Sequence, residues 1–345
     1  MAAGVSAGKK KGLHAIADAR GVIAALAIDQ RHALRTLFAT VMHVDAARVP
    51  AEVLVHFKEA VSRILTPHAS AILLDPEYGL PAASQRAKTA GLLLAYEQTG
   101  YDDKVSGRLP RLLDHWSVPR LMEQGANGIK LLLYYSTTSE TSINAQKHAF
   151  VENVGAECAA ADIPFFLELV SYAEGVDEKG ADFARGKPEI VIESMREFSH
   201  ARYQVDVLKV GVPVNVAYVQ GSPSAKSEVL HSRGEALQLY RRAAEATHLP
   251  FIYLSHGVSN QAFQFALQLA AEAEVKFSGV LCGRATWKEG VSVSIERGAH
   301  ALEDWLADEG VRNIQNVNKC LSSARPWFAL NSEPHRTESQ ECLSA

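Results

Sequence analysis

Eight short apolar segments recur along the chain, each bounded by turn residues and separated from the next by a longer stretch. We predict strands at Val22–Asp29, Ser70–Asp75, Gly91–Glu97, Gly128–Tyr135, Pro164–Val170, Val205–Pro213, Pro250–Ser255 and Phe277–Gly283. Their apolar residues are nearly continuous, which is typical of strands that helices cover on both faces. Two intervening stretches, Glu52–Leu65 and Gln261–Ala273, have apolar residues at helical spacing. This alternation predicts an α/β protein with a (β/α)8 TIM barrel, with a doubly wound parallel sheet as the alternative.

The length of the chain, 345 residues, fits either one enlarged barrel or two ordinary domains. No stretch is rich enough in Pro, Gly and Ser to be a domain linker, and no fixed-period repeat is present. We therefore predict a single barrel domain over residues 1–345, with its core at about 13–326. Tyr172–Gln204 is expected to form an elaborated loop and a helix, and Glu333–Ala345 a disordered polar tail.

The composition excludes several classes of protein. With 47% hydrophobic and 21% charged residues, the chain is neither disordered nor a disulfide scaffold. Its net charge of -4 argues against a nucleic acid or a membrane surface as the main partner, because both require a concentrated basic face. The apolar run from Gly21 to Ile28 is too short to span a bilayer, and no apolar signal-peptide core follows Lys9–Lys11. A soluble protein is expected.

Cysteine and histidine patterns give no sign of a metal centre. The four cysteines are widely spaced without a CxxC pair, which favours a reduced, cytoplasmic setting: Cys158, Cys282, Cys320 and Cys342. There is no H-E-x-x-H motif, and His32 and His256 at strand ends are single histidines, so we expect no metal. G-x-S-x-G and Walker A patterns are also absent, which disfavours serine hydrolases and P-loop proteins.

Ionisable residues recur at the carboxyl ends of the predicted strands. They are Asp29, Arg31, Asp75, Glu77, Glu97, Lys130, Glu168, Lys209, His256 and Arg284. Barrel enzymes place their chemistry at this end of the barrel. Because such a residue accompanies every strand, the pattern favours an active site over unrelated structural roles.

Lys209 is the most informative of these residues, because it has apolar neighbours on both sides. Lysine is rarely buried without a partner. An amine that burial and a nearby cation such as Lys130 keep uncharged can attack a carbonyl carbon. The alternative is a structural lysine paired with Glu168 or Asp206, since ion pairs are more common than Schiff-base lysines.

Three further residues share this apolar setting. Glu168 lies in Phe166–Leu169, where burial raises the pKa of a carboxyl group and suits it to proton transfer near neutral pH. Each residue has a structural alternative: a buried salt bridge for Glu168, a lysine reaching solvent at the barrel bottom for Lys130, and a turn or helix-cap residue for Asp29. One shared site explains them more simply than three separate roles.

The loops after the last two strands have the composition of an anion site. Ser255, His256 and Gly257 follow the seventh strand, and Gly283 and Arg284 follow the eighth. Barrel enzymes often bind phosphate between these two loops. Glycine allows close backbone approach, and the Arg284 guanidinium can bind phosphate through two hydrogen bonds. We predict a phosphate site here.

Long stretches from about Lys10 to Pro326 are similar to one known family. They are LAIDQRHALR, ILLDPEYGLPA, GIKLLLYY, IPFFLELVSYAEG, VDVLKVGVPVNVAYVQG, LPFIYLSHGVSNQAFQ and FSGVLCGRATW. These stretches closely resemble the tagatose 1,6-bisphosphate aldolases, a class I, Schiff-base family of (β/α)8 barrels. The resemblance implies reversible cleavage of D-tagatose 1,6-bisphosphate to dihydroxyacetone phosphate and D-glyceraldehyde 3-phosphate, without a metal or other cofactor.

The resemblance also implies a role for each site residue. Lys209 matches the family's iminium-forming lysine, and Glu168 matches its acid/base carboxylate. Asp29 and Lys130 match the charged residues that support these two. The implied substrate-binding residues are Gln30, Arg31, Ser255, Gly257, Gly283 and Arg284. The last four would hold the C1 phosphate, and Arg31 is the predicted partner of the second phosphate.

Three positions depart from the family pattern and leave the exact ketose open. Gly211 stands where the family usually has an acidic residue, His256 where it has a small residue, and His32 where glycine is common. Cleavage of fructose 1,6-bisphosphate, sulfofructose 1-phosphate or another ketose phosphate is therefore an alternative. A non-catalytic sugar-phosphate sensor is a further one, although a sensor would not need the full catalytic set. The resemblance also implies a homodimer and a role in lactose or galactose catabolism.

Overall fold

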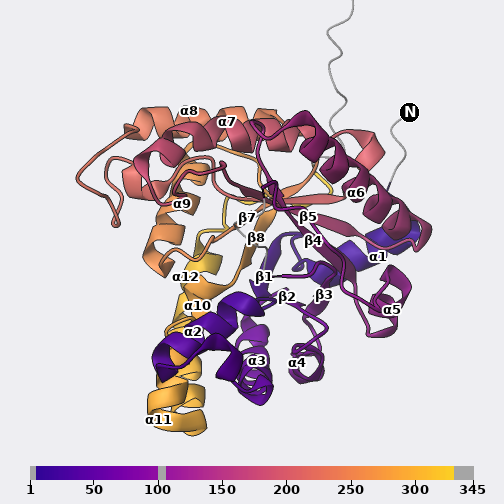
Figure 1. The fold of residues 1–345 in the computed structure, drawn as a ribbon, viewed down its shortest axis with the longest axis vertical. Helices are drawn as coiled ribbons and strands as arrows, with labels where there is room; N and C mark the ends of the chain where they lie inside the picture. The colour runs from indigo at the N-terminus through magenta and orange to yellow at the C-terminus, as the bar shows by residue number, and fades with distance from the viewer. Residues whose placement is uncertain (1–4, 100–105, 330–345) are drawn as a thin grey trace, which may run out of the picture.

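Eight parallel strands close into a barrel in the computed structural model, which describes residues 5–99 and 106–329 (Figure 1). The strands are β1 (Ile23–Ala27), β2 (Ala71–Leu74), β3 (Gly91–Ala95), β4 (Gly128–Tyr135), β5 (Phe165–Ser171), β6 (Val207–Val210), β7 (Phe251–Leu254) and β8 (Gly279–Cys282). They pair in sequence order, and β8 pairs with β1. The predicted barrel is confirmed, and the doubly wound sheet is excluded because that sheet has two open edges.

Helices connect the strands and surround the barrel (Figure 1). They are α1 (Ala7–Ile16), α2 (His32–Met42), α3 (Ala51–Leu65), α4 (Leu80–Gln85), α5 (Val118–Glu123), α6 (Thr141–Ala160), α7 (Ala181–Glu197), α8 (Arg233–Glu245), α9 (Asn260–Glu272), α10 (Arg284–Trp287), α11 (Gly290–Trp305) and α12 (Val311–Lys319). The two helices predicted from apolar spacing are α3 and α9. A loop followed by α7 occupies the stretch predicted as an elaborated loop and helix. The predicted tail Glu333–Ala345 lies outside the described residues.

Several strands end earlier than the sequence predicts, and this places charged residues in loops. β1 ends at Ala27 and β3 at Ala95, so Asp29 and Glu97 each lie two residues beyond the last strand residue. The apolar run continues past each strand because the first loop residues are also buried. As a result, these two carboxylates lie at the carboxyl rim of the barrel.

Alternate strand residues point into the barrel, since side chains alternate with a period of two along a strand. Inward strand residues form one apolar cluster together with residues of α1 and with Trp327. We call this cluster the floor: Leu13, Ile16, Ile23, Ala25, Ala27, Ala71, Leu73, Leu93, Ala95, Phe166, Val207, Ile252, Leu281 and Trp327. Two residues further along their strands, Phe166 is followed by Glu168 and Val207 by Lys209. The same inward face therefore changes from apolar to charged toward the carboxyl end, which we call the mouth.

The first helix closes the amino end of the barrel. Leu13 and Ile16 of α1 belong to the floor, together with Trp327 from near the end of the described chain. The helix backbone lies directly against β3, because a Cβ atom on Gly91 would be 2.3 Å from the carbonyl oxygen of Ala15. Glycine at position 91 thus allows the contact, and the barrel has its opening at the mouth.

Candidate active site

Five charged side chains converge at the mouth of the barrel. Lys130 comes from β4, Glu168 from β5 and Lys209 from β6, and Asp29 and Glu97 come from the loops after β1 and β3. All five are buried. Four of them follow an inward apolar residue at an interval of two, and Lys130 follows Gly128, whose Cβ position faces Ile16 and Phe166 of the floor. The alternation of the strands itself therefore brings them to one place.

Lys130 lies at the centre of this cluster. Its Nζ is 2.8 Å from Oδ2 of Asp29, 2.6 Å from Oε1 of Glu97 and 2.9 Å from Oε2 of Glu168. Burial alone lowers the pKa of Lys130, but the three carboxylates raise it well above its ordinary value, so the ammonium stays charged. The structural alternative, a lysine reaching solvent at the barrel bottom, is wrong because Lys130 is fully buried at the mouth.

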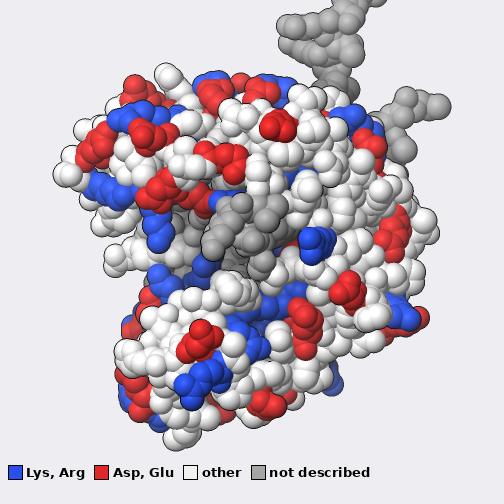
Figure 2. Space-filling view, in the orientation of Figure 1, with Lys and Arg blue, Asp and Glu red and all other residues white. Residues whose placement is uncertain are grey.

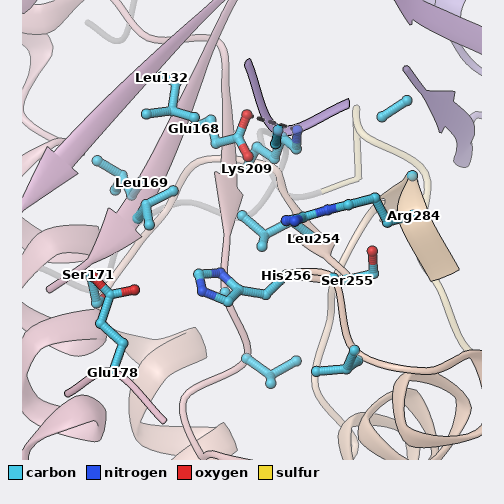
Figure 3. A pocket seen from close by; sticks show the side chains of 18 of the residues that line it. Leu132, Glu168, Leu169, Ser171, Glu178, Lys209, Leu254, Ser255, His256 and Arg284 are labelled. Atoms are coloured by element: carbon cyan, nitrogen blue, oxygen red, sulfur yellow. Dashed lines mark hydrogen bonds and ion pairs between the residues drawn. The ribbon is translucent and has the colours of Figure 1, made fainter. Parts of the chain in front are cut away.

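Lys209 and Glu168 form the second contact of the cluster (Figure 3). The two residues face each other in the register of β5 and β6, and Nζ of Lys209 donates to Oε2 of Glu168 at 2.8 Å. Asp206, the other partner predicted for a structural Lys209, instead pairs with Lys9 of α1 at 2.8 Å. The Lys209 amine therefore has a proton acceptor on one side, and it borders a cavity.

The predicted protonation of Glu168 is corrected by the structure. Burial does raise the pKa of Glu168, but the ammonium groups of Lys130 and Lys209 lower it below its ordinary value overall. Asp29 behaves alike: burial raises its pKa, whereas Lys130 and Lys209 bring it well below the usual range. The sequence expectation considered burial without the two adjacent cations. Both groups are carboxylates at neutral pH, and Glu168 begins a reaction as a proton acceptor.

A cavity of about 780 Å³ opens above this cluster. Asp29, Glu97, Glu168 and Lys209 line it, together with residues of the loops after β1, β5, β6, β7 and β8. Figure 2 shows a hollow in one face of the molecule, with Lys and Arg side chains at its edge. A cavity of this size accommodates a small phosphorylated metabolite.

The four residues predicted for the first phosphate share one wall of the cavity. Ser255, Gly257, Gly283 and Arg284 all line it, and Figure 3 shows Ser255 and Arg284 on the same side. Gly257 has a φ of 74°, and a Cβ atom there would lie 2.8 Å from Cζ of Arg284. Glycine therefore permits both the left-handed backbone and the close seat of the guanidinium. The structure brings these residues together as the sequence predicts.

Arg31 lines the cavity, but other groups already hold its terminal nitrogens. Nη1 donates to Oε2 of Glu77 at 2.8 Å, and Nη2 donates to the backbone oxygen of Glu97 at 2.6 Å. Its side chain is buried. Gln30, the other predicted residue of this loop, lines the cavity as well. The structure thus places both residues at the site, while the carboxylate and the carbonyl compete with a phosphate for Arg31.

Among the cavity residues that were not predicted as site residues are Glu97 and Lys187. Glu97 contacts Lys130 and also accepts a 3.1 Å hydrogen bond from the backbone N–H of Leu132. The sequence does mark Glu97, since it ends an apolar strand segment. Glu168 and Lys209 are marked similarly, because each interrupts an apolar strand segment. Lys187 reaches the cavity from α7. No strand-end pattern marks a helical lysine, so no comparable signal is present in the sequence.

The three residues that depart from the family pattern all line the cavity: His32, Gly211 and His256. A Cβ atom on Gly211 would meet no atom within 4 Å, so the space beside it is open. His256 has a φ of 48° and extends into the cavity (Figure 3). Desolvation inside the cavity, together with the positive charges of Lys187 and Arg284, lowers the pKa of His256 to about 4. The imidazole is therefore neutral at pH 7.

Other features of the described residues bear on the remaining predictions. Within residues 5–99 and 106–329, no group of three or more His, Cys, Asp and Glu side chains is arranged to hold a metal ion. In the same part of the chain, no helix has the length and apolarity to cross a membrane. Cys158, Cys282 and Cys320 are free thiols, and Cys342 lies outside the described residues.

Comparisons with known proteins agree with this geometry. A model of the DeoC/LacD family of aldolases matches residues 23–289. Tagatose 1,6-diphosphate aldolase 2 of Enterococcus faecalis is 50% identical over 327 residues, which cover 94% of this chain and 97% of that protein. Tagatose 1,6-diphosphate aldolase of Lactococcus lactis subsp. lactis is 49% identical over 321 residues, covering 92% and 97%. A Schiff-base-forming fructose-1,6-bisphosphate aldolase shares the fold, with a TM-score of 0.52 and 12% identity over 88% of this chain and 96% of that one.

Proposed function

The chain belongs to the DeoC/LacD family of aldolases, and from this premise we propose that it is a class I tagatose 1,6-bisphosphate aldolase. It would cleave D-tagatose 1,6-bisphosphate reversibly to dihydroxyacetone phosphate and D-glyceraldehyde 3-phosphate. The observation that carries this proposal is the 2.8 Å contact between Lys209 and Glu168 at the wall of the cavity. An amine beside a carboxylate base can become a neutral nucleophile during the reaction.

The first phosphate of the substrate binds at the wall formed by Ser255, Gly257, Gly283 and Arg284. The guanidinium of Arg284 supplies charge-assisted hydrogen bonds, and the glycine backbone lets the phosphate approach closely. Lys209 lines the same cavity as this wall (Figure 3). Binding of the C1 phosphate therefore brings the adjacent C2 carbonyl within reach of the amine.

Schiff-base formation uses Lys209 and Glu168 together. Glu168 accepts a proton from the Lys209 ammonium, and the neutral amine attacks C2 to give a carbinolamine. Protonated Glu168 then returns its proton to the departing hydroxyl group, so that water leaves and the iminium forms. Lys130 stays protonated throughout, because its three carboxylate neighbours stabilise its charge.

Carbon–carbon cleavage follows from the iminium. Glu168, again a carboxylate, takes the proton of the C4 hydroxyl group, and the electrons of the C3–C4 bond move into the iminium to form an enamine. The aldehyde product departs, C3 is reprotonated, and hydrolysis of the new iminium releases dihydroxyacetone phosphate and Lys209. The lysine iminium is the electron sink, so the proposed chemistry needs no metal or other cofactor. Asp29, which lines the cavity, orients the substrate hydroxyl groups, and Lys130 holds Asp29 and Glu168 in place from beneath it.

Borohydride trapping tests the proposal. The protein is incubated with dihydroxyacetone phosphate, reduced, digested and analysed by mass spectrometry. The expected adduct is at Lys209. The masses of the digested peptides distinguish this residue from the buried lysines Lys58, Lys130 and Lys147. An adduct at another lysine, or full cleavage activity in Lys209→Ala, would contradict the Schiff-base mechanism. Loss of activity with EDTA would favour a metal-dependent mechanism instead.

A different ketose phosphate is the second candidate substrate, and the cavity residues Gly211, His256 and His32 favour testing it. They change the charge and shape of the wall relative to the family pattern. Comparison of kcat/KM for tagatose 1,6-bisphosphate, fructose 1,6-bisphosphate and sulfofructose 1-phosphate separates the alternatives. We expect the first to be the best substrate. Absence of turnover, together with tight binding of these ligands, would instead support a sugar-phosphate sensor.

The family membership also leads us to propose the setting of the enzyme. We expect a single-domain, cytoplasmic enzyme that forms a homodimer, acts on phosphorylated ketoses and triose phosphates, and serves lactose or galactose catabolism. Light scattering coupled to size-exclusion chromatography tests the dimer. A mass equal to that of one chain would contradict it.

A further inference from the structure

Lys187 is a cavity-lining cation for which the described residues provide no carboxylate partner. It comes from the second turn of α7, and its Nζ donates to the backbone oxygen of Val214 at 3.2 Å. Among the described residues, no carboxylate forms an ion pair with it. Burial lowers the pKa of Lys187 to about 8, and no nearby charge opposes this shift. The ammonium is thus mostly charged at pH 7 and not neutralised, which favours the binding of an anion.

Other cations of the cavity are less suited to a second anion. Lys209 is paired with Glu168, and the terminal nitrogens of Arg31 are held by Glu77 and Glu97. Two further lysines at the rim, Lys179 and Lys226, are exposed to solvent, where water screens their charge. Of the described cavity residues, Lys187 is therefore the cation that gains most from a second bound anion.

The position of Lys187 separates it from the first phosphate site. Its Nζ contacts Val214 in the loop after β6, whereas Ser255 and Arg284 follow β7 and β8. His256 is near both cations, whose charges act on its imidazole, and its ring points away from Arg284 (Figure 3). As a neutral imidazole, His256 adds no charge of its own and can donate a hydrogen bond to an anion. The nearby carboxylate of Glu178 is paired with Arg108 at 2.7 Å, which offsets its repulsion.

We propose that Lys187, with His256 beside it, binds the second phosphate of the substrate, the one that leaves on the aldehyde product. This inference rests on the proposed aldolase function and assigns to α7 a role that the sequence had given to Arg31. A ketose bisphosphate carries a phosphate at each end, so it requires two cation sites on one cavity. Arg284 supplies one, and Lys187 supplies the other.

The test compares two aldehydes in the condensation direction. Dihydroxyacetone phosphate is added to glyceraldehyde 3-phosphate or to unphosphorylated glyceraldehyde, and kcat and KM are measured for each. In Lys187→Met we expect KM for glyceraldehyde 3-phosphate to rise about 10- to 100-fold, the effect of losing a charged hydrogen bond. The kinetics with glyceraldehyde and the KM for dihydroxyacetone phosphate should change little. Lys187→Arg should keep most of the preference for the phosphorylated aldehyde.

Lys226→Met is the matched control, since Lys226 lines the same cavity but is exposed. In this variant we expect KM for glyceraldehyde 3-phosphate to change by less than about twofold. Trapping of dihydroxyacetone phosphate on Lys209 in the Lys187→Met protein verifies that the site is folded. If Lys187→Met does not trap dihydroxyacetone phosphate, Lys187→Arg and His256→Ala are measured instead. An unchanged preference for the phosphorylated aldehyde in both of these variants overturns the proposal. An unchanged preference in Lys187→Met, or an equal rise in KM for dihydroxyacetone phosphate, also overturns it. Failure of the unaltered protein to trap any ketose would instead contradict the aldolase function itself.

Discussion

The floor and the mouth of the barrel are built on the same strands but differ in what they bury. Phe166 and Val207 contribute to the floor, and Glu168 and Lys209, two residues further along, contribute to the mouth. Burial of a large apolar side chain stabilises the fold by about 1.5–3 kcal/mol. Burial of a charge pair contributes little net stability, because desolvation offsets the attraction. Stability and chemistry therefore lie at opposite ends of the same strands.

The largest expected effect is on catalysis at the mouth. Lys209→Met should lower kcat/KM by at least about 10³-fold, because it removes the nucleophile. It should also lower the thermal midpoint, because Glu168 loses one of its two cations and keeps only its 2.9 Å contact with Lys130. Enzyme-coupled assays and calorimetry measure the two quantities. A variant that loses stability but keeps activity would show that Lys209 serves the fold.

Glu168→Gln should lower kcat by about 10²- to 10³-fold, because the amide cannot accept the proton of Lys209 or of the substrate. Its matched control is Phe166→Leu, which lies on the same strand and faces the floor. That control should reduce the free energy of unfolding and leave kcat within about twofold. Equal losses of kcat in the two proteins would contradict a catalytic role specific to Glu168.

A substitution at the floor is expected to change stability and to leave catalysis nearly unaffected. Ile16→Ala should lower the free energy of unfolding by about 2–5 kcal/mol, because it leaves a cavity between α1 and the barrel. The kcat of the folded protein should stay within about twofold. Urea unfolding and steady-state kinetics provide both numbers. Lys11→Ala, an exposed change on the same helix, should shift stability by less than about 0.5 kcal/mol; a similar loss there would assign the effect to the helix and not to the floor.

The smallest expected effect concerns acid. The pKa values of Asp29 and Glu168 are lower in the folded protein than in an unfolded chain, so the stability they provide is present above about pH 4–5 and is lost as pH falls through the lowered values. The free energy of unfolding falls between pH 5 and pH 2. In the double variant Asp29→Asn/Glu168→Gln this fall should be smaller than in the unaltered protein, by on the order of 2 kcal/mol. Urea unfolding at both pH values measures this difference.

Asp206, near the floor, supplies a control, because its pKa shift has the opposite sign to those of Asp29 and Glu168. Burial raises the pKa of Asp206 despite its contact with Lys9, so this residue favours the folded state at acid pH and loses that contribution as pH rises. Asp206→Asn should therefore not diminish the acid loss. If Asp206→Asn protected the protein from acid as well as the double variant does, the difference between mouth and floor would not hold.

The sequence predicts the barrel and most of the catalytic cluster because both depend on local spacing. The apolar runs give the strands, and the interval of two residues from Phe166 to Glu168 and from Val207 to Lys209 gives the shared inward face. The ionisation of Glu168 could not be predicted in this way. It depends on distances of 2.8–2.9 Å to two cations on neighbouring strands, which only the closed barrel establishes.

Two other site features depend on contacts across long stretches of chain. Arg31 is engaged by Glu77 and Glu97, which belong to the loops after the next two strands. Lys187 reaches the cavity because α7 packs against β5 and β6 with one particular rotation. A helical lysine in the sequence has the same pattern whether it faces solvent or substrate. Both features therefore emerged from the fold alone.

The closure of the floor by α1 has a consequence for biosynthesis. Its apolar residues Leu13 and Ile16 leave the ribosome well before Phe166, Val207 and Trp327. The apolar face of α1 thus lacks part of its native contacts until Trp327 has been synthesised. Contacts of such high sequence separation slow folding and keep apolar surface exposed to aggregation. The nascent protein is consequently expected to depend on chaperones most through its first helix.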